Sequence, residues 1–259
     1  MATSSQQNST DLIAKMAWDT LKTQWEAFFL LPLLVMVGVN ALNYFSLDLL
    51  GQQKTILISI LMIIAEVVFF GAFGTAMAKW CSELYSGKKE IDIASGLRFG
   101  LSRFFPLIWT WIVSFFKLCL WGMLFVLPGY YHVITYSQSF KITQLEGLSG
   151  GSTNRLSQLL VEESGFLRTL GNYSALLILN YLLFIPLILM GALTTILLTL
   201  ITSPEQLEVL AQNMVFPFTV IISIGITAVT ALTGTFGSYQ YLIYRDENKK
   251  VFDAAKKAL

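Results

Sequence analysis

The sequence predicts an all-α fold: a polytopic membrane protein with six transmembrane helices and amphipathic helices on its cytoplasmic face. Composition supports this class, because 55% of the 259 residues are hydrophobic and 13% are charged, about half the charged share of an ordinary soluble domain. Mean hydropathy is +0.64. Apolar stretches long enough to cross a hydrocarbon core of about 30 Å recur along the chain. The placement of Lys and Arg supplies the third observation.

The N-terminal segment is polar. Residues 1–10 are rich in Ser, Gln and Asn, and we expect them to be disordered. Charged side chains then recur at helical spacing over 11–26, with apolar residues covering much of the remaining surface. This pattern predicts an amphipathic helix along the membrane interface or, alternatively, a simple cytoplasmic extension of the first span. Residues 11–259 are expected to form a single six-helix membrane domain.

Hydropathy and helix punctuation place the remaining elements. The six spans are expected at 27–46, 55–79, 106–127, 129–144, 173–199 and 218–244. Two further amphipathic helices are expected on the cytoplasmic side, at 92–104 and 156–170. Asp92 suits the N-cap of the first of these, with Ile93, Leu97 and Leu101 on its apolar side. An acidic loop is expected over 201–213.

The fourth span is the least apolar, and it follows a Pro128-Gly129 break. Charge asymmetry decides whether it crosses the bilayer. If it crosses, 15 of the 17 Lys and Arg residues lie inside and Lys54 alone lies outside, whereas without it 7 lie inside and 9 outside. Lys117 is intramembrane in both arrangements. We therefore predict six spans in the cell (inner) membrane, with both termini cytoplasmic.

Two charged residues fall near the middle of predicted spans, where insertion of such a group costs about 2.5–3.5 kcal/mol. Glu66 and Lys117 belong to consecutive antiparallel spans, so we expect them to approach within salt-bridge or one-water distance. Other polar residues recur at helical spacing on the third and fourth spans. The candidate binding zone comprises Glu66, Lys117, Ser114, His132, Tyr136, Gln138 and Ser139. It is interpreted either as a polar path or as a structural ion pair with polar helix contacts.

The sequence carries no signature of catalysis or of metal binding. It contains no H-E-x-x-H, no P-loop, no G-x-S-x-G and no Cys/His set with metal-ligand spacing. We therefore expect no catalytic residue, no metal site and no cofactor. With a net charge of +1, no global field draws nucleic acid, so the expected partner is the lipid bilayer. A membrane-protein partner or a second copy of the chain is a further candidate.

Three stretches resemble a known family. They are SGLRFGLSRFFPLIW leading to FVLPGYYHVITYSQSF, then SGFLRTLGN, and finally YQYLIYRDE. In this order they resemble a prokaryotic superfamily of six-helix membrane domains, which includes the membrane domain of some glycerophosphodiester phosphodiesterases. The resemblance implies six spans and no catalytic residues, because in those enzymes a separate soluble domain performs the chemistry. Pro128 and Gly129 carry over as structural positions only.

Two functional hypotheses follow. The first is a non-enzymatic integral membrane protein that organises the membrane, handles lipid or supports a partner. It rests on the missing catalytic signature and on the amphipathic helices expected at the cytoplasmic face. The alternative is a small transporter or channel subunit that uses the polar zone around Glu66, Lys117 and the fourth span.

Overall fold

The all-α prediction is confirmed. The computed structural model describes residues 3–50, 52–124, 126–201 and 204–259, and no strand occurs among them. The chain forms two compact units, each described separately below. The first unit comprises residues 1–24, 68–175 and 232–259, and the second comprises 25–67 and 176–231. Whether the whole of 11–259 behaves as a single domain stays a prediction.

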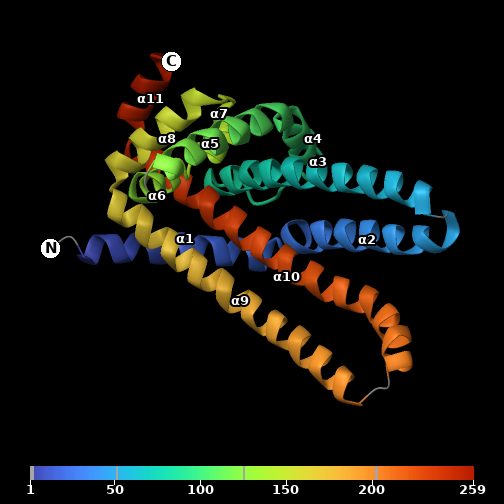
Figure 1. Cartoon of the computed structure of the whole chain (residues 1–259). Helices are drawn as coiled ribbons and strands as arrows, with labels where there is room; N and C mark the ends of the chain where they lie inside the picture. The colour runs from blue at the N-terminus through green and yellow to red at the C-terminus, as the bar shows by residue number, and fades with distance from the viewer. Residues whose placement is uncertain (1–2, 51, 125, 202–203) are drawn as a thin grey trace. The chain divides into compact units, whose positions relative to one another are not determined.

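Eleven α-helices and one π-helical turn make up the described chain (Figure 1). In order they are α1 (Thr3–Thr23), the turn η1 (Glu26–Leu30), α2 (Leu31–Leu50), α3 (Gln52–Tyr85), α4 (Ile93–Ser102), α5 (Phe104–Leu124), α6 (Val126–Thr135), α7 (Ser139–Glu146), α8 (Gly151–Ser164), α9 (Phe166–Ile201), α10 (Pro204–Glu247) and α11 (Lys249–Lys257).

Three to four helices of the described residues are long and apolar enough to cross a membrane, fewer than the six spans predicted. Three stand alone: Ile60–Tyr85, Phe104–Met123 and Thr219–Glu247. The fourth candidate is the broken pair Thr10–Thr23 and Glu26–Leu42. The predicted fifth span lies within the 36-residue α9, but most of its side chains beyond residue 182 lie outside the described residues. The membrane class therefore holds.

Two segments expected to be irregular are helical instead. Helix α1 begins at Thr3 and includes 3–10; no Pro or Gly interrupts this stretch, and Thr10 donates to Asn172 Oδ1 at 2.5 Å. The disorder expected of residues 1–10 stays a prediction. Helix α10 begins at Pro204, so most of the predicted 201–213 loop is also helical. Proline suits a first helical turn because it lacks the N–H that would be unpaired there.

Helix α4 has the predicted extent but buries a different face. Asp92 caps it as expected, accepting a hydrogen bond from Ser95 N at 3.1 Å. The buried residues are Gly96 and Gly100, whereas Ile93 and Leu101 are exposed. A Cβ on Gly100 would lie 2.0 Å from the carbonyl oxygen of Ala72, so glycine is needed for α4 to approach α3 this closely.

The predicted surface helix over 156–170 is split. Helix α8 ends at Ser164, and α9 begins at Phe166. Between them Gly165 has a φ of +96°, which breaks the helix. Leu156 and Leu160 are buried as expected of an apolar side, but Leu167 is 73% exposed.

The predicted fourth span, 129–144, is not one helix. Helix α5 ends at Leu124 and α6 begins at Val126, so Pro128 lies in the first turn of α6, where its missing N–H is tolerated. A turn over 136–138 then separates α6 from α7. Neither piece reaches the length of a span. At this turn Gln138 N donates to Ser157 of α8, and the Ser137 carbonyl oxygen accepts from the Tyr173 hydroxyl of α9.

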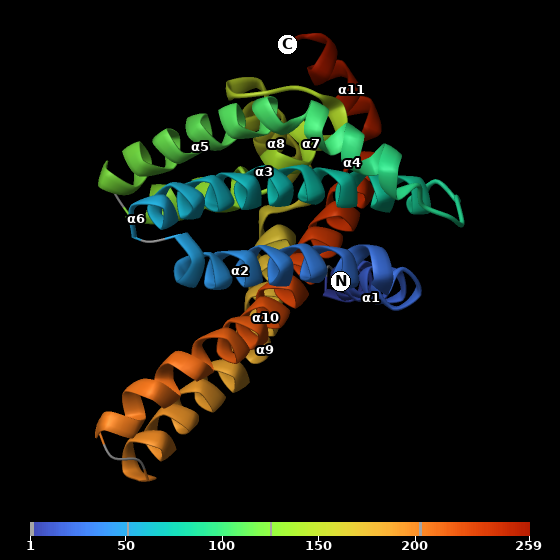
Figure 2. The same ribbon diagram turned by 90° about the vertical axis from the view of Figure 1, so that its right-hand side faces the viewer.

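The segment nevertheless returns along the whole of α5 (Figure 2). A Cβ on Gly129 would lie 3.0 Å from Gly122 Cα, so the helices approach closely at the hairpin end. Farther along, His132 lies against Trp121, and at the other end Thr143 contacts Thr110. Helices α6 and α7 thus run antiparallel to α5 between Gly122 and Thr110.

The interior of the first unit combines large aromatic side chains with polar ones. Its largest buried side chains include Trp80, Tyr241, Tyr244 and Phe252. The hydroxyl of Tyr244 accepts hydrogen bonds from Asn172, Thr169 and Gln240 at 3.1, 3.3 and 3.3 Å. These bonds join the start of α9 to the end of α10.

Helix α11 is clasped to the same unit beside α7 and α8 (Figure 1). Phe252 is 1% exposed and contacts the ring of Tyr241. The carboxylate of Glu146, at the end of α7, accepts from Lys256 at 2.5 Å, from Tyr241 at 2.7 Å and from Arg245 at 3.2 Å. The amphipathic C-terminal helix is therefore held by one buried aromatic side chain and one shared acid.

In the second unit, α2 contacts α10 through polar side chains. Asn40 Nδ2 lies 3.5 Å from Ser223 Oγ, and Thr227 Oγ1 lies 3.9 Å from Met36 Sδ. Asn40 also donates to the carbonyl oxygen of Met36 within its own helix at 2.9 Å. Polar contacts of this kind are a common means of associating helices in lipid.

Candidate functional site

A polar seam runs between α5 and the returning helices α6, α7 and α8. Thr110 and Ser114, one turn apart on α5, begin it. The Thr110 hydroxyl lies 2.8 Å from that of Thr143 and accepts a hydrogen bond from Gly150 N at 3.0 Å. The Ser114 hydroxyl donates to Asn154 Oδ1 at 2.9 Å. The helical spacing that predicted a polar stripe on α5 thus corresponds to a row of side chains facing one set of neighbours.

The seam continues toward the hairpin with Lys117 and Trp121. The Lys117 ammonium lies 5.8 Å from the centre of the Tyr136 ring, within range of a cation–π contact. The His132 ring lies between those of Trp121 and Tyr136, with centroids 4.7 and 5.0 Å away. The structure therefore brings together four of the predicted site residues: Ser114, Lys117, His132 and Tyr136.

Gln138 and Ser139 lie at the turn that divides the returning segment, and both are buried. Ser157 of α8 satisfies two backbone groups at this turn, because its hydroxyl accepts from Gln138 N at 3.0 Å and donates to the Thr135 carbonyl at 2.6 Å. Glu66 belongs to the second unit and Lys117 to the first. Their pairing stays a prediction.

Some buried polar atoms of the seam lack a hydrogen-bond partner in the part of the chain that the structure describes. Several of its buried side-chain atoms have no hydrogen-bond partner among the described residues: His132 Nδ1, Gln138 Oε1, Ser139 Oγ, Gln144 Oε1 and Asn154 Nδ2. A buried polar atom without a partner costs about 1–3 kcal/mol. The Gln144 side chain lies near Gly74 of α3, and the other four atoms belong to residues of α6, α7, α8 and the turn over 136–138. Such atoms indicate places where water or a ligand supplies the missing partners.

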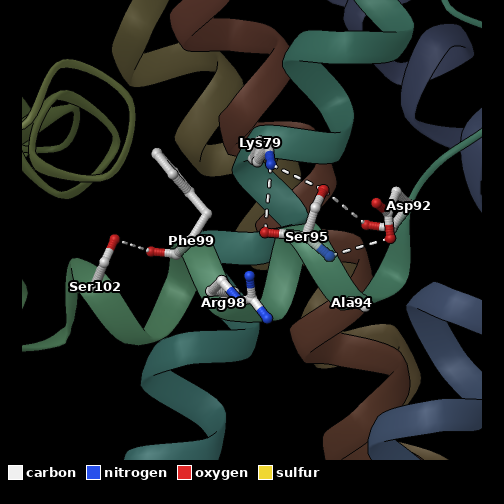
Figure 3. Close-up of a pocket in the computed structure, with 7 residues that line it drawn as sticks. All are labelled: Lys79, Asp92, Ala94, Ser95, Arg98, Phe99 and Ser102. Carbon is white, nitrogen blue, oxygen red and sulfur yellow. Dashed lines mark hydrogen bonds between the residues drawn. The ribbon is translucent and has the colours of Figure 1, made fainter.

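A second feature is a basic pocket of about 560 Å³ between the end of α3 and helix α4 (Figure 3). Lys79 enters it from α3, and the other lining residues come from α4 and its cap: Asp92, Ala94, Ser95, Arg98, Phe99 and Ser102. The Lys79 ammonium donates to the Ser95 hydroxyl at 3.0 Å and to the Ser95 carbonyl at 3.3 Å. The ammonium also lies 5.4 Å from the centre of the Phe99 ring.

Arg98 is the free cation of this pocket. Its side chain is exposed and forms no hydrogen bond or ion pair with any residue that the structure describes. Asp92 supplies the opposite charge, but its carboxylate is engaged in capping α4. The pocket therefore presents one unengaged guanidinium and one partly engaged ammonium, which also lies 4.0 Å from Glu83 Oε1, whereas its two hydroxyl groups donate to the carbonyl oxygens of Asp92 and Phe99. The two cations suit the oxygen atoms of an anion.

Some of these residues could be predicted from sequence and others could not. Lys79 and Arg98 each adjoin an aromatic residue, a pattern typical of groups that contact lipid head groups. Asn154 and Ser157 were missed, because α8 reads from sequence as a surface helix. The Asn154 and Ser157 side chains are 1% and 0% exposed. The only sequence signal of this burial is their spacing, which places them on one helix face with Leu160.

No three His, Cys, Asp or Glu side chains converge as metal ligands within the part of the chain that the structure describes. Both cysteines carry free thiols. Comparison of the chain with protein-family models, with curated proteins and with solved structures finds no match.

Proposed function

We propose that this chain is a non-enzymatic, polytopic membrane protein that handles lipid by binding anionic head groups in the pocket between α3 and α4. The basic pocket carries the proposal, because Lys79 and Arg98 lie where an apolar helix long enough to cross a membrane ends at Tyr85. Each Lys or Arg near an anionic membrane surface contributes about 1 kcal/mol of attraction.

Apolar side chains beside the pocket support a lipid ligand over a soluble one. Ile93 and Leu101 on α4 are 40% and 54% exposed, and Phe105 at the start of α5 is 78% exposed. A head group bound by Lys79 and Arg98 would leave its acyl chains next to these residues. Basic groups beside exposed apolar groups are the usual composition of an interfacial lipid site.

We also propose that residues 129–144 complete a crossing, which gives six passages and places both termini in the cytoplasm. Two observations support this topology. The broken helix α6–α7 follows α5 from Gly122 back to Thr110, and the distribution of Lys and Arg favours an even number of crossings. Under this topology the basic pocket faces the anionic cytoplasmic leaflet.

Lipid retention tests the proposed function. The chain is purified in nanodiscs that contain phosphatidylglycerol and phosphatidylcholine, and bound lipid is counted by native mass spectrometry. Replacing both cations (Lys79→Gln with Arg98→Gln) should weaken phosphatidylglycerol binding by roughly tenfold or more, because about 2 kcal/mol of attraction is lost. The control is Lys250→Gln with Lys257→Gln on α11, which removes the same charge and should leave binding unchanged. Equal loss in both pairs would refute a specific pocket.

A transport role is the second candidate, and the unpartnered polar atoms along the seam favour it. Transport predicts that Lys117 and Tyr136 line a hydrated path. A cysteine at Tyr136 should then react with a water-soluble thiol reagent in intact membranes. A dry seam would leave this cysteine unreactive and would remove the second candidate.

A further inference from the structure

We propose that the N-terminus of α8, together with Lys117 and Asn154, forms a binding site for a phosphate group. This site lies on the seam, separate from the pocket between α3 and α4, and it does not rest on the proposed function. The ligand is identified by its chemistry: a phosphate carried either by a lipid or by a small molecule in water.

The charge arrangement is the first argument. The N-terminus of a helix carries about half a positive charge and attracts anions. Here the neighbouring charged group is a cation, because Lys117 Nζ lies 3.8 Å from the position that a Cβ on Gly151 would occupy. Lys117 forms no ion pair with any acid that the structure describes. Two positive groups face each other, and an anion between them would relieve the repulsion.

The second argument is that the helix terminus has no internal cap. Gly150 occupies the N-cap position, and no side chain accepts from the first turn. The hydroxyls of Ser152 and Thr153, which could have capped it, donate instead to the carbonyl oxygens of Ser149 and Gly150. Backbone N–H groups at such a terminus commonly bind phosphate oxygens.

Asn154 supplies the independent observation that points to a ligand. Its side chain is 1% exposed, and its Oδ1 is occupied by the Ser114 hydroxyl. Its Nδ2 has no partner among the described residues, although it lies in the first turn of α8, one turn from Gly151 on the same helix face. The first turn of α8 thus holds a buried amide donor without a partner, and the ammonium near Gly151 at the same terminus forms no ion pair with a described acid.

The indole of Trp109 extends the set of donors. Its Nε1 lies 2.8 Å from the position of a Cβ on Gly150, and the side chain is 55% exposed. Ammonium, amide, indole and backbone N–H donors lie at this terminus, and no described carboxylate forms an ion pair with Lys117. Donors without an acceptor suit a phosphate, which offers only acceptor oxygens.

Native mass spectrometry of the full chain in detergent tests the site, with the pocket removed by Lys79→Gln and Arg98→Gln in every sample. Phosphatidic acid and inorganic phosphate are titrated separately. Lys117→Met should weaken phosphate binding about tenfold or more, because it removes a hydrogen bond from a charged group. Lys117→Arg should retain phosphate binding, because arginine keeps a charged donor. Binding of phosphatidic acid alone assigns a lipid-borne phosphate, and competition by inorganic phosphate assigns a water-borne one.

Asn154→Asp provides a second variant that keeps the Ser114 hydrogen bond and introduces a fixed anion beside Lys117. It should abolish phosphate binding and raise the unfolding temperature, so loss of binding cannot be attributed to misfolding. The proposal would be overturned if Lys117→Met and Asn154→Asp bound phosphatidic acid and inorganic phosphate as tightly as the parent chain does. It would also be overturned if the parent chain bound neither. Either result would leave the pocket proposal standing, because that proposal is measured with Lys79 and Arg98 restored.

Discussion

At the scale of single residues, the hydroxyl of Tyr244 lies where α9 and α10 meet in the first unit. It accepts from Thr169, Asn172 and Gln240, and Arg168 lies over its ring at 4.8 Å. Two buried amide groups and the Thr169 hydroxyl, which also donates to the Gly165 carbonyl at 3.3 Å, therefore converge on one oxygen. The stretch YQYLIYRDE includes this tyrosine, but no local pattern reveals its partners, because two of them lie 72 and 75 residues away along the chain.

Tyr244→Phe should lower the free energy of unfolding by about 1–3 kcal/mol, since buried donors would lose their acceptor while the ring packing stays. Chemical unfolding in detergent measures the change. Tyr181→Phe is the control, because Tyr181 is 65% exposed, and its effect should stay within about 0.5 kcal/mol. Equal stability of the two variants would contradict the role given to Tyr244.

Glu146 makes the clasp of α11 sensitive to acid. Burial by itself would raise the pKa of Glu146, but the hydrogen bonds from Lys256 and Tyr241 and the charge of Lys256 lower it below its ordinary value of 4.5. A carboxyl group with a depressed folded-state pKa stabilises the fold fully above that ordinary value. Its contribution is then lost as the pH falls through the folded-state pKa.

We therefore expect α11 to detach as the pH falls through the folded-state pKa of Glu146, seen as faster cleavage of α11, relative to the rest of the chain, by a protease that is active in acid. Glu146→Gln should release α11 already at neutral pH and should remove most of the acid dependence. A clasp that stays protected at low pH, or a variant whose cleavage still accelerates in acid, would show that another group controls it.

At the scale of elements, α4 shows what an amphipathic pattern can and cannot reveal. The pattern predicts the helix, its extent and its Asp92 cap, because these depend on neighbouring residues. It misplaces the buried face, since Gly96 and Gly100 have no hydropathic signal and yet allow the closest approach to α3. Ile93 and Leu101 remain exposed, as suits a helix beside lipid.

Gly100→Ala should displace α4 from α3 and cost roughly 1–3 kcal/mol, because its Cβ would meet the Ala72 carbonyl at 2.0 Å. Since Lys79 and Arg98 then no longer face one pocket, phosphatidylglycerol binding should also fall. Gly171→Ala is the matched control: nothing lies within 4 Å of its Cβ, so the change should be neutral or slightly stabilising. Intact lipid binding in Gly100→Ala would argue against a pocket shared by the two helices.

The returning segment after α5 is the other instructive element. Sequence predicts its extent, and the polar stripe on α5 predicts where contacts fall along it. The turn over 136–138 could not be predicted, because Ser157 supplies the compensating hydrogen bonds from a distant part of the chain. A break that would be costly in isolation is satisfied by a neighbour that no local pattern reveals.

At the scale of the whole molecule, composition and charge placement predict the class and the sidedness, because both are sums over many residues. The division into two compact units depends on which distant segments meet, so it could not be predicted. Helices α3, α9 and α10 each contribute to both units.

The proposed topology is tested with a single cysteine at Glu163, an exposed position in the last turn of α8. In a Cys81→Ala, Cys119→Ser background, Glu163→Cys should resist a membrane-impermeant reagent applied to intact cells and react after lysis. A cysteine at Glu205, beyond the fifth span, should react in intact cells. Labelling of position 163 from outside would exclude an even number of crossings.

The row of matched polar groups along α5 has a consequence for assembly. In lipid there is no hydrophobic driving force between apolar helices, so apolar surfaces alone leave the axial register of two helices poorly fixed. A shift of α5 by one turn, about 5.4 Å, would break the Thr110–Thr143 and Ser114–Asn154 hydrogen bonds together. The hydroxyl and amide groups thus fix the axial register of the helices, and the hairpin can form in one register only.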